Sequence, residues 1–188
     1  MGALAIMCVR YNACMRLFIA TELPQEMLDA LAETQAELRA CVSGRYVGAD
    51  SFHVTLAFLG EVEAWRVNEL ADILDDACSG HAAFESCLGE LGNFGRASKA
   101  TLWQGFTDKK PFAELAQSVR RELAHAGFDF DDKGFLPHIT LMRKLDLSSG
   151  VLPMPHVARG TIDTVSLFES DLSGDYPAYT ALHRTFLA

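Results

Sequence analysis

Two histidines of the chain lie in nearly identical five-residue stretches. The first motif, residues 52–56, reads Phe-His-Val-Thr-Leu, and the second motif, residues 137–141, reads Pro-His-Ile-Thr-Leu. In both, a β-branched apolar residue separates histidine from threonine, and β-branched residues favour strands. Because side chains alternate between the faces of a strand, each motif should carry histidine and threonine on one face and its apolar residues on the other.

If the two strands lie with their polar faces converging, two imidazoles and two hydroxyls line one cleft. The candidate groups are His53 and Thr55 from the first motif and His138 and Thr140 from the second. Histidine titrates near neutral pH, so one imidazole can accept a proton while the other donates one. The pattern therefore predicts an acid–base site for chemistry on a phosphate.

A single His-x-Thr sequence in a strand is more often structural than catalytic. Here the two copies match at their polar and apolar positions, and each follows an amphipathic helix pattern. We therefore interpret the pair as functional. The remaining histidines lack such a context and are interpreted as surface or structural residues: His81, His125, His156 and His183.

Composition limits the class of protein. The chain has 188 residues, 49% hydrophobic and 22% charged, which suits a single domain with a sizeable core. We expect residues 1–14 to be a loose extension, without the pattern of a signal peptide, before a two-lobed domain at 15–188. No apolar run has the length of a membrane span. A net charge of −9 argues against a broad nucleic-acid binder but allows a small basic site for one nucleotide or RNA end.

The cysteines predict the compartment. They are odd in number, and none is paired at C-x-x-C spacing; they are Cys8, Cys14, Cys41, Cys78 and Cys87. Free buried thiols in a reducing compartment are the simplest interpretation, which places the protein in the cytoplasm.

Periodicity predicts a mixed α and β chain. Helices are expected at about 24–41, 62–79 and 108–126, because apolar residues recur there at helical spacing. Each histidine motif follows one of these helices after a short connector, so the halves form a pseudo-repeat. This order predicts a two-lobed α+β architecture with approximate internal symmetry. The expected strands are 16–21, 45–47, 52–60, 84–91, 100–106, 137–144, 157–169 and 176–187, with a glycine-rich loop at 92–99.

Other kinds of site find less support. Catalytic zinc uses three protein ligands, whereas the motifs offer two histidines, each followed at the second position by threonine, a poor zinc ligand. A metal site is therefore disfavoured. Neither a Gly-x-Ser-x-Gly nucleophile motif nor a Gly-x-x-x-x-Gly-Lys phosphate loop occurs.

The two motifs together resemble the two-histidine (2H) phosphoesterase superfamily, and in particular the bacterial RNA 2′,3′-cyclic phosphodiesterases, the LigT-like or 2′-5′ RNA ligase-like proteins. The resemblance departs at 45–50, where Tyr46 stands in place of an expected Trp and the usual Pro is missing. The matching segments are 15–20, 52–62, 91–94, 102–103, 135–143, 167–170 and Tyr179.

The resemblance implies antiparallel sheets forming a central cleft with helices on the outside. It also implies a hydrolase that opens a 2′,3′-cyclic phosphate to a 2′-phosphomonoester without metal or cofactor, on RNA ends or small cyclic nucleotides. His138 would accept the water proton and His53 would protonate the leaving oxygen, although the sequence alone does not fix which does which. Thr55, Thr140 and Arg143 would bind the phosphate.

Further nucleotide contacts are predicted from residue type and position. Phe18, Phe58 and Tyr46 are candidate stacking surfaces for a base. Basic residues near the motifs are candidate phosphate contacts, namely Arg45, Arg96 and Lys99. We expect the protein to act as a monomer, away from membranes.

Two rival functions remain open from the sequence. The first is a non-catalytic module that binds RNA ends or nucleotides. The second is 2′-5′ RNA ligation, as a reverse activity of the same site or as an ATP-dependent ligase. The ATP-dependent form is disfavoured, because no nucleotide-charging Lys motif is present.

Overall fold

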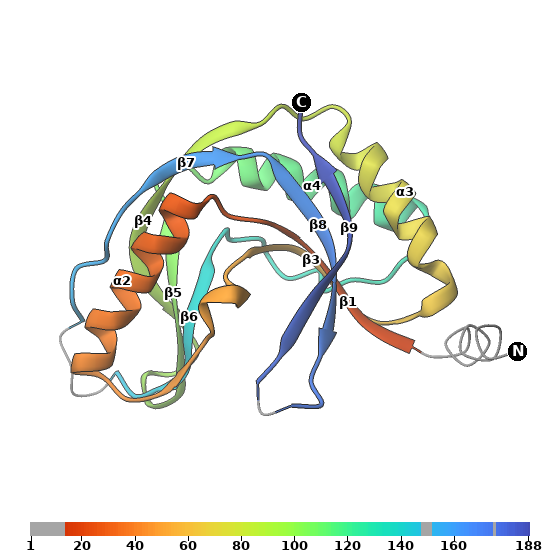
Figure 1. Ribbon diagram of the computed structural model, residues 1–188. Coiled ribbons are helices and arrows are strands. Elements are labelled where there is room, and N and C mark those ends of the chain that lie inside the picture. Colours follow the sequence, from red (N-terminus) through yellow and green to blue (C-terminus); the bar gives the residue numbers. More distant parts are fainter. Residues whose placement is uncertain (1–13, 148–151, 175) are drawn as a thin grey trace, which may run out of the picture.

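Two antiparallel sheets form the framework of the protein in a computed structural model, which describes residues 14–147, 152–174 and 176–188 (Figure 1). The β1 sheet has the strand order β3-β1-β8-β9, and the β5 sheet has the order β2-β6-β5-β4-β7. The predicted α+β class with antiparallel sheets is confirmed. The strands of the β1 sheet are β3 (Val54–Glu63), β1 (Cys14–Thr21), β8 (Thr164–Asp171) and β9 (Ala178–Phe186). Those of the β5 sheet are β2 (Arg45–Tyr46), β6 (Ile139–Leu145), β5 (Ala100–Phe106), β4 (Phe84–Phe94) and β7 (Arg159–Ile162).

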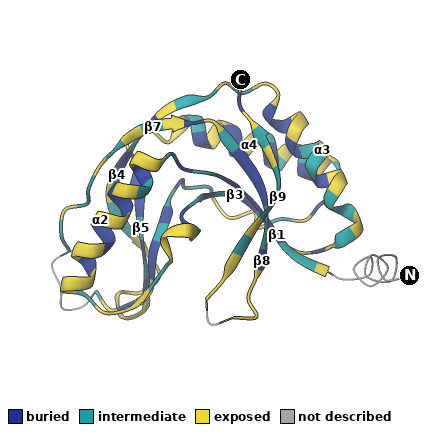
Figure 2. Cartoon of the chain, viewed as in Figure 1, coloured by how far each residue is buried: buried dark blue, intermediate teal, exposed yellow. Residues whose placement is uncertain are grey.

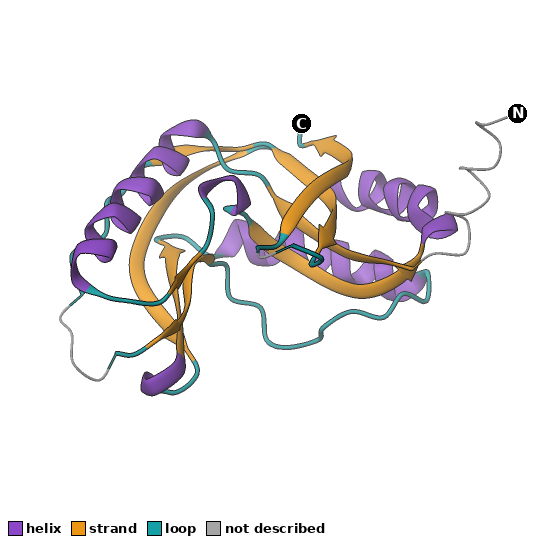
Figure 3. Ribbon diagram, turned by 60° about the horizontal axis from the view of Figure 1, so that its bottom comes forward, coloured by secondary structure: helices purple, strands orange, loops and turns teal. Residues whose placement is uncertain are grey.

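In the part of the chain that the structure describes, three α-helices cover the outer faces of the sheets, and three short 3-10 turns connect the longer elements. Figures 1 and 3 show α2 on one side of the molecule and α3 on the other. The helices are α2 (Gln25–Cys41), α3 (Val67–Cys78) and α4 (Lys110–His125), and the turns are η1 (Ala49–Ser51), η2 (Ala64–Arg66) and η3 (Ala97–Lys99). In Figure 2 the helices alternate between buried and exposed residues, as amphipathic helices do when one face packs on a sheet.

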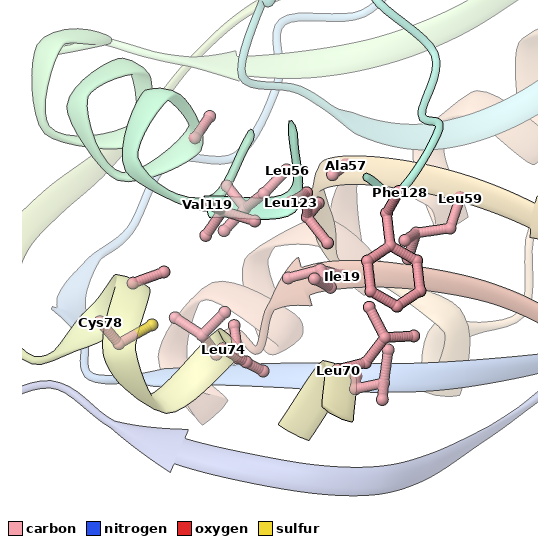
Figure 4. Close-up of a cluster of buried hydrophobic side chains, with 14 of the residues drawn as sticks. Ile19, Leu56, Ala57, Leu59, Leu70, Leu74, Cys78, Val119, Leu123 and Phe128 are labelled. Atoms are coloured by element: carbon pink, nitrogen blue, oxygen red, sulfur yellow. The ribbon is translucent and has the colours of Figure 1, made fainter. Parts of the chain in front are cut away.

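The two sheets have separate apolar cores. The first core lies between the β1 sheet and α3 with most of α4, where Leu70, Leu74, Val119 and Leu123 meet Ile19 (Figure 4). The second core lies between the β5 sheet and α2. It contains Met27, Leu31, Ile139, Leu141 and Phe112, the last from the first turn of α4. Helix α4 therefore joins the two cores, which fixes one sheet relative to the other.

The histidine motifs begin the strands predicted for them. Strand β3 starts at Val54 and β6 at Ile139, each directly after its histidine. Val54 and Leu56 are fully buried, whereas His53 and Thr55 are partly exposed. The second motif repeats this alternation, with Ile139 and Leu141 buried and His138 and Thr140 partly exposed. The predicted division into one polar and one apolar face is confirmed.

Each motif strand is held from behind by the helix that precedes the other motif. Gln35 of α2 donates hydrogen bonds from Nε2 to the carbonyl oxygens of Leu141 and Val47, both at 2.8 Å. Arg120 of α4 donates from Nε to the carbonyl oxygen of Leu56 at 2.9 Å. Leu56 and Leu141 occupy the same last position of their motifs. The two halves of the pseudo-repeat have therefore exchanged their helices.

Several of the predicted boundaries differ from the structure. The strand predicted at 157–169 is two strands, because the chain changes sheet at Asp163: β7 pairs with β4 and β8 with β1. Ile162 enters the second core and Val165 the first. The helix predicted from 62 begins at Val67, because β3 continues to Glu63, opposite Cys14.

The glycine-rich stretch at 92–99 was expected to be a loop, but β4 extends through Phe94. Gly92 lies opposite Trp103 of β5, and a Cβ atom at position 92 would lie 2.3 Å from the Trp103 ring. This glycine therefore permits the close approach of an indole within the sheet. Gly95, at φ 84°, makes the turn that follows.

Residues 1–13 lie outside the described residues, so the loose extension stays a prediction, although Cys14 already belongs to β1. The described cysteines, Cys14, Cys41, Cys78 and Cys87, are free thiols, as predicted, and Cys8 is outside the described residues. The prediction that they are buried holds for Cys78 but is wrong for Cys14 and Cys41, which are exposed at the start of β1 and the end of α2. Among the described residues, no helix has the length and apolarity needed to cross a membrane.

Replacement of Gln35 tests the contact between α2 and the second motif. Gln35 is 6% exposed, and Gln35→Met keeps its size but removes both hydrogen bonds. Loss of a partner for a buried carbonyl costs about 1–3 kcal/mol. We expect urea unfolding to show a loss of that size. Gln25→Met, at the exposed start of the same helix, should change stability by less than about 0.5 kcal/mol. Equal effects of the two variants would contradict the assigned role of Gln35.

Candidate active site

A cavity of about 1080 Å³ lies between the two sheets. Its walls include Phe18, His53 and Tyr179 from the β1-sheet side and Tyr46 and Arg143 from the β5 sheet. The site residues predicted from the sequence that line it are Phe18, Tyr46, His53, Thr55, Phe58 and Arg143. Residues from both halves of the chain therefore meet at one concave surface, as the resemblance implied.

His53 is held by a local backbone contact. Its Nδ1 lies 2.8 Å from the carbonyl oxygen of Ser51, at the end of η1. A carbonyl oxygen only accepts, so Nδ1 carries the hydrogen and Nε2 of the neutral ring presents its lone pair. Nε2 lies 3.0 Å from the Thr55 hydroxyl, which can donate to it. The ring centroids of Phe18 and Tyr179 lie 4.9 Å and 5.3 Å from that of the imidazole.

His138 is held in the same way. Its Nδ1 lies 2.7 Å from the carbonyl oxygen of Leu136, again the residue two positions earlier. Aromatic rings also surround this imidazole: the centroid of Phe94 lies at 4.8 Å, edge to face, and that of Trp103 at 6.0 Å. Both histidines thus have the same tautomer, with Nε2 as the reactive nitrogen.

The surroundings keep both imidazoles neutral. Burial among aromatic rings lowers the pKa of His53 to about 4, with smaller contributions from the charges of His138 and Arg143. Burial also lowers the pKa of His138, and the charge of Arg143 adds to this. Since Arg143 acts on both rings and His138 acts on His53, the three groups form one electrostatic cluster. Near pH 7 the cluster carries the charge of Arg143 alone, which suits it to receive an anion.

Not every predicted residue lies on the wall of this cavity. His138 and Thr140 are not among the lining residues, although Thr140 shares β6 with Arg143, and His138, directly before that strand, lowers the pKa of His53. Of the three further cations predicted to contact phosphate, Arg45 lines the cavity, whereas Arg96 and Lys99 do not. That the two imidazoles act on one phosphate remains a prediction, supported by their electrostatic coupling.

The aromatic candidates have different surroundings. Phe18 is 3% exposed and packs against His53, so it offers little surface to a base. Phe58 has the guanidinium of Arg16 over its ring at 4.5 Å. Tyr46 is held by two contacts. The guanidinium of Arg39 lies over its ring, 4.0 Å from the centroid, and the Tyr46 hydroxyl donates a hydrogen bond to the backbone. Phe58 and Tyr46 are therefore the better candidates for contact with a nucleotide.

Sequence reasoning missed several neighbours of the histidines. Tyr179 and Phe168 reach His53 from the last two strands, and Phe94 and Trp103 reach His138 from β4 and β5. The resemblance includes these positions among its matching segments but does not place them beside the histidines, since they come together only through sheet pairing. The lining also contains more cations than were predicted: Arg16, Arg39, Arg45, Arg143 and Lys144, against one carboxylate, Asp50. The local positive charge expected in an acidic chain is therefore present.

Metal binding was disfavoured from the sequence. Within the ranges that the structure describes, no group of three or more His, Cys, Asp or Glu side chains is arranged to hold a metal ion. The metal-free scheme stays a prediction for the experiments below.

Titration of the imidazoles tests their environment. In NMR spectra of the free protein, we expect His53 to titrate near pH 4 and His138 below 6.5, because burial disfavours the charged ring. His156 is the internal control. Contacts with Glu37 and Glu33 at 2.9 and 3.0 Å raise its pKa, so it should titrate above 6.5. Titration of all three at the same pH would contradict the assigned surroundings.

Comparison with known proteins agrees with this geometry. The family model of the 2′-5′ RNA ligase superfamily matches residues 27–171. The RNA 2′,3′-cyclic phosphodiesterase of Thermotoga maritima is 29% identical over 178 residues, covering 90% of this chain and 94% of that protein.

Solved structures show the same architecture. Escherichia coli LigT complexed with 3′-AMP superposes with a TM-score of 0.78 at 28% identity, covering 93% of this chain and 99% of that one. The crystal structure of the Thermus thermophilus protein TT0787 gives a TM-score of 0.82 at 26% identity, covering 92% of this chain and 98% of that one.

Proposed function

Because the chain belongs to the 2′-5′ RNA ligase superfamily of two-histidine phosphoesterases, we propose that it is an RNA 2′,3′-cyclic phosphodiesterase, a hydrolase that opens 2′,3′-cyclic phosphate ends to 2′-phosphomonoesters. Relatives that bear this name match most of the chain. The substrate class is RNA ends, with small cyclic nucleotides as the minimal form. We propose that the protein acts in the cytoplasm, because its free thiols suit a reducing compartment. We also propose that it acts as a monomer.

The observation that carries the proposal is the matched pair of imidazole contacts. Both Nδ1 atoms donate to a carbonyl two residues earlier, at 2.8 and 2.7 Å. Each contact fixes the tautomer and leaves Nε2 able to accept or to donate a proton. Two histidines prepared alike are what phosphodiester hydrolysis needs, since one must take a proton from water and the other must give one to the leaving oxygen.

The proposed reaction assigns one proton transfer to each histidine. Nε2 of His138 accepts a proton from water as the water oxygen forms a bond to phosphorus. The bond between phosphorus and the 3′ oxygen breaks, and protonated Nε2 of His53 gives its proton to that oxygen. The product is a 2′-phosphomonoester with a free 3′ hydroxyl. Proton exchange with solvent then returns both rings to their starting states.

The negative charge of the bound phosphate favours the protonated form of His53, which the proposed mechanism requires. In the free protein the His53 ring is neutral near pH 7, because its pKa is about 4. An anionic cyclic phosphate beside the ring favours the imidazolium and raises that pKa. Thr55 and Thr140 can donate to the non-bridging oxygens, and Arg143, which already acts electrostatically on both rings, stabilises the negative charge. Substrate binding and activation of the acid are therefore coupled.

Replacement of either histidine tests the proposed catalysis. We expect His53→Ala and His138→Ala each to lower turnover of uridine 2′,3′-cyclic phosphate by about 10²–10⁴, the usual contribution of a general acid or base. EDTA should leave the wild-type rate unchanged, and the sole product should be the 2′-monophosphate. His125→Ala, an exposed histidine at the end of α4, is the matched control and should retain full activity.

Three results would contradict the proposal. Full activity of both histidine variants would remove their catalytic roles. Loss of activity in EDTA with recovery on added zinc would replace the metal-free scheme. Binding of the cyclic nucleotide without turnover by the wild-type protein would favour the non-catalytic module.

A further inference from the structure

The cavity holds more positive charge than one cyclic phosphate requires. Besides Arg143, its walls carry Arg39 of α2, Arg45 of β2 and Lys144 of β6. We propose that Arg39, Arg45 and Lys144 form a second anion subsite, which binds internal phosphates of the RNA strand that carries the cyclic end. This inference rests on the proposed function and names its preferred substrate: an oligonucleotide rather than a mononucleotide.

A β-bulge places two of the cations on one surface. Pairing of β5 with β6 joins Leu102 to Met142 and Ala100 to Leu145. Arg143 and Lys144 therefore stand opposite Thr101 alone, which is a two-against-one bulge. In a regular strand, neighbouring side chains point to opposite faces, yet both cations line the cavity.

The bulge has a backbone cost. Lys144 has φ 58°, and it is the one non-glycine residue with positive φ in the described part of the chain. A long side chain rarely adopts this conformation, and such strain persists where it serves a site. Here it follows directly after Arg143, the residue proposed to bind the reacting phosphate. We infer that the strain orients Lys144 toward the same negatively charged ligand.

Two arginines directly opposite one another point the same way. Arg45 of β2 pairs in register with Arg143 of β6, and both line the cavity. Like charges opposite one another across a strand pair destabilise a sheet. An anion bound beside both guanidinium groups interacts favourably with the two charges at once. A polyanion suits this position better than a neutral ligand does.

Aromatic contacts hold the outer cations in place. Arg39 stacks on Tyr46 at 4.0 Å, and the Tyr46 hydroxyl is tied to the Val42 carbonyl at 2.9 Å. Arg45 lies over Tyr176, which the β8–β9 connection brings from the other sheet, at 5.2 Å. The two guanidinium groups are thus ordered before a ligand arrives, which reduces the entropy lost on binding.

Three of the cavity cations have no carboxylate partner in the described part of the chain. Among residues 14–147, 152–174 and 176–188, no ion pair is found for Arg39, Arg143 or Lys144. Some cations elsewhere on the chain do have carboxylate partners, as Arg66 has Glu69 and Arg121 has Glu122. A single strand of RNA supplies the missing charge as a series of phosphates, each of which an arginine can bind in bidentate fashion.

The test compares two substrates with the same reacting end. One is uridine 2′,3′-cyclic phosphate, and the other is a tetranucleotide ending in uridine 2′,3′-cyclic phosphate. We expect the wild-type protein to show a higher kcat/KM on the tetranucleotide, mainly through a lower KM. This advantage should decrease as salt is added. A plot of the logarithm of the kcat/KM ratio against the logarithm of salt concentration should have a slope of about −0.7 per phosphate contact.

Two charge-removing variants locate the subsite. Arg39→Gln changes an exposed residue, and Lys144→Gly is free of strain at φ 58°, so both proteins should fold. Each should lower the ratio of tetranucleotide to mononucleotide kcat/KM by about three- to tenfold and reduce the salt slope by about 0.7. Lys110→Ala is the matched control: it loses the same charge, from an exposed pair with Glu114 on α4, and should keep the wild-type ratio.

The outcomes separate the two proposals. If the wild-type protein fails to hydrolyse the mononucleotide and the tetranucleotide alike, the proposed function is wrong. If it hydrolyses both with equal kcat/KM, or if Arg39→Gln and Lys144→Gly behave like Lys110→Ala, the proposed function stands and the second subsite is wrong.

Discussion

The carbonyl oxygens of Leu56 and Leu141 are the points on which the site depends. Each ends a histidine motif, and each accepts a hydrogen bond from a helix in the other half of the pseudo-repeat, from Arg120 and Gln35 respectively. A motif strand therefore cannot move alone, because its position is fixed by the partner half. The same strands bury Val54 and Ile139 beneath the histidines. Exchange of helices and burial of alternate side chains together fix two strands from different sheets around one cavity.

The tautomer of each histidine is set by a local backbone contact. Both motifs bend the backbone so that a carbonyl two residues earlier receives the Nδ1 hydrogen. Burial beside aromatic rings then lowers the pKa of both imidazoles. The consequence is a free site with two neutral bases beside the single charge of Arg143. In the proposed mechanism, such a site reaches its working protonation state when an anion enters, so activation of the acid is linked to occupancy by a phosphate.

The sequence predicted what depends on local pattern and missed what depends on pairing. Strand alternation placed His53 and Thr55 on one face, and this was correct, because it follows from backbone geometry alone. The change of sheet at Asp163 was not predicted, since an apolar alternating stretch does not encode which neighbour it pairs with. Tyr179 near His53 and the bulge at Lys144 were missed for the same reason. Both arise from register between strands distant in sequence.

The distribution of charge links the fold to the size of the ligand. The chain carries a net charge of −9, yet the cavity between the two sheets is lined by five cations and one carboxylate. On the outer surface, pairs such as Arg66 with Glu69 leave little positive field. A long duplex laid across the protein would meet mostly negative charge, whereas a single-stranded end entering the cavity meets arginines. An acidic chain with a basic cavity therefore disfavours broad nucleic-acid binding and favours recognition of an RNA end. The position of the positive charge selects a single-stranded end over a long duplex.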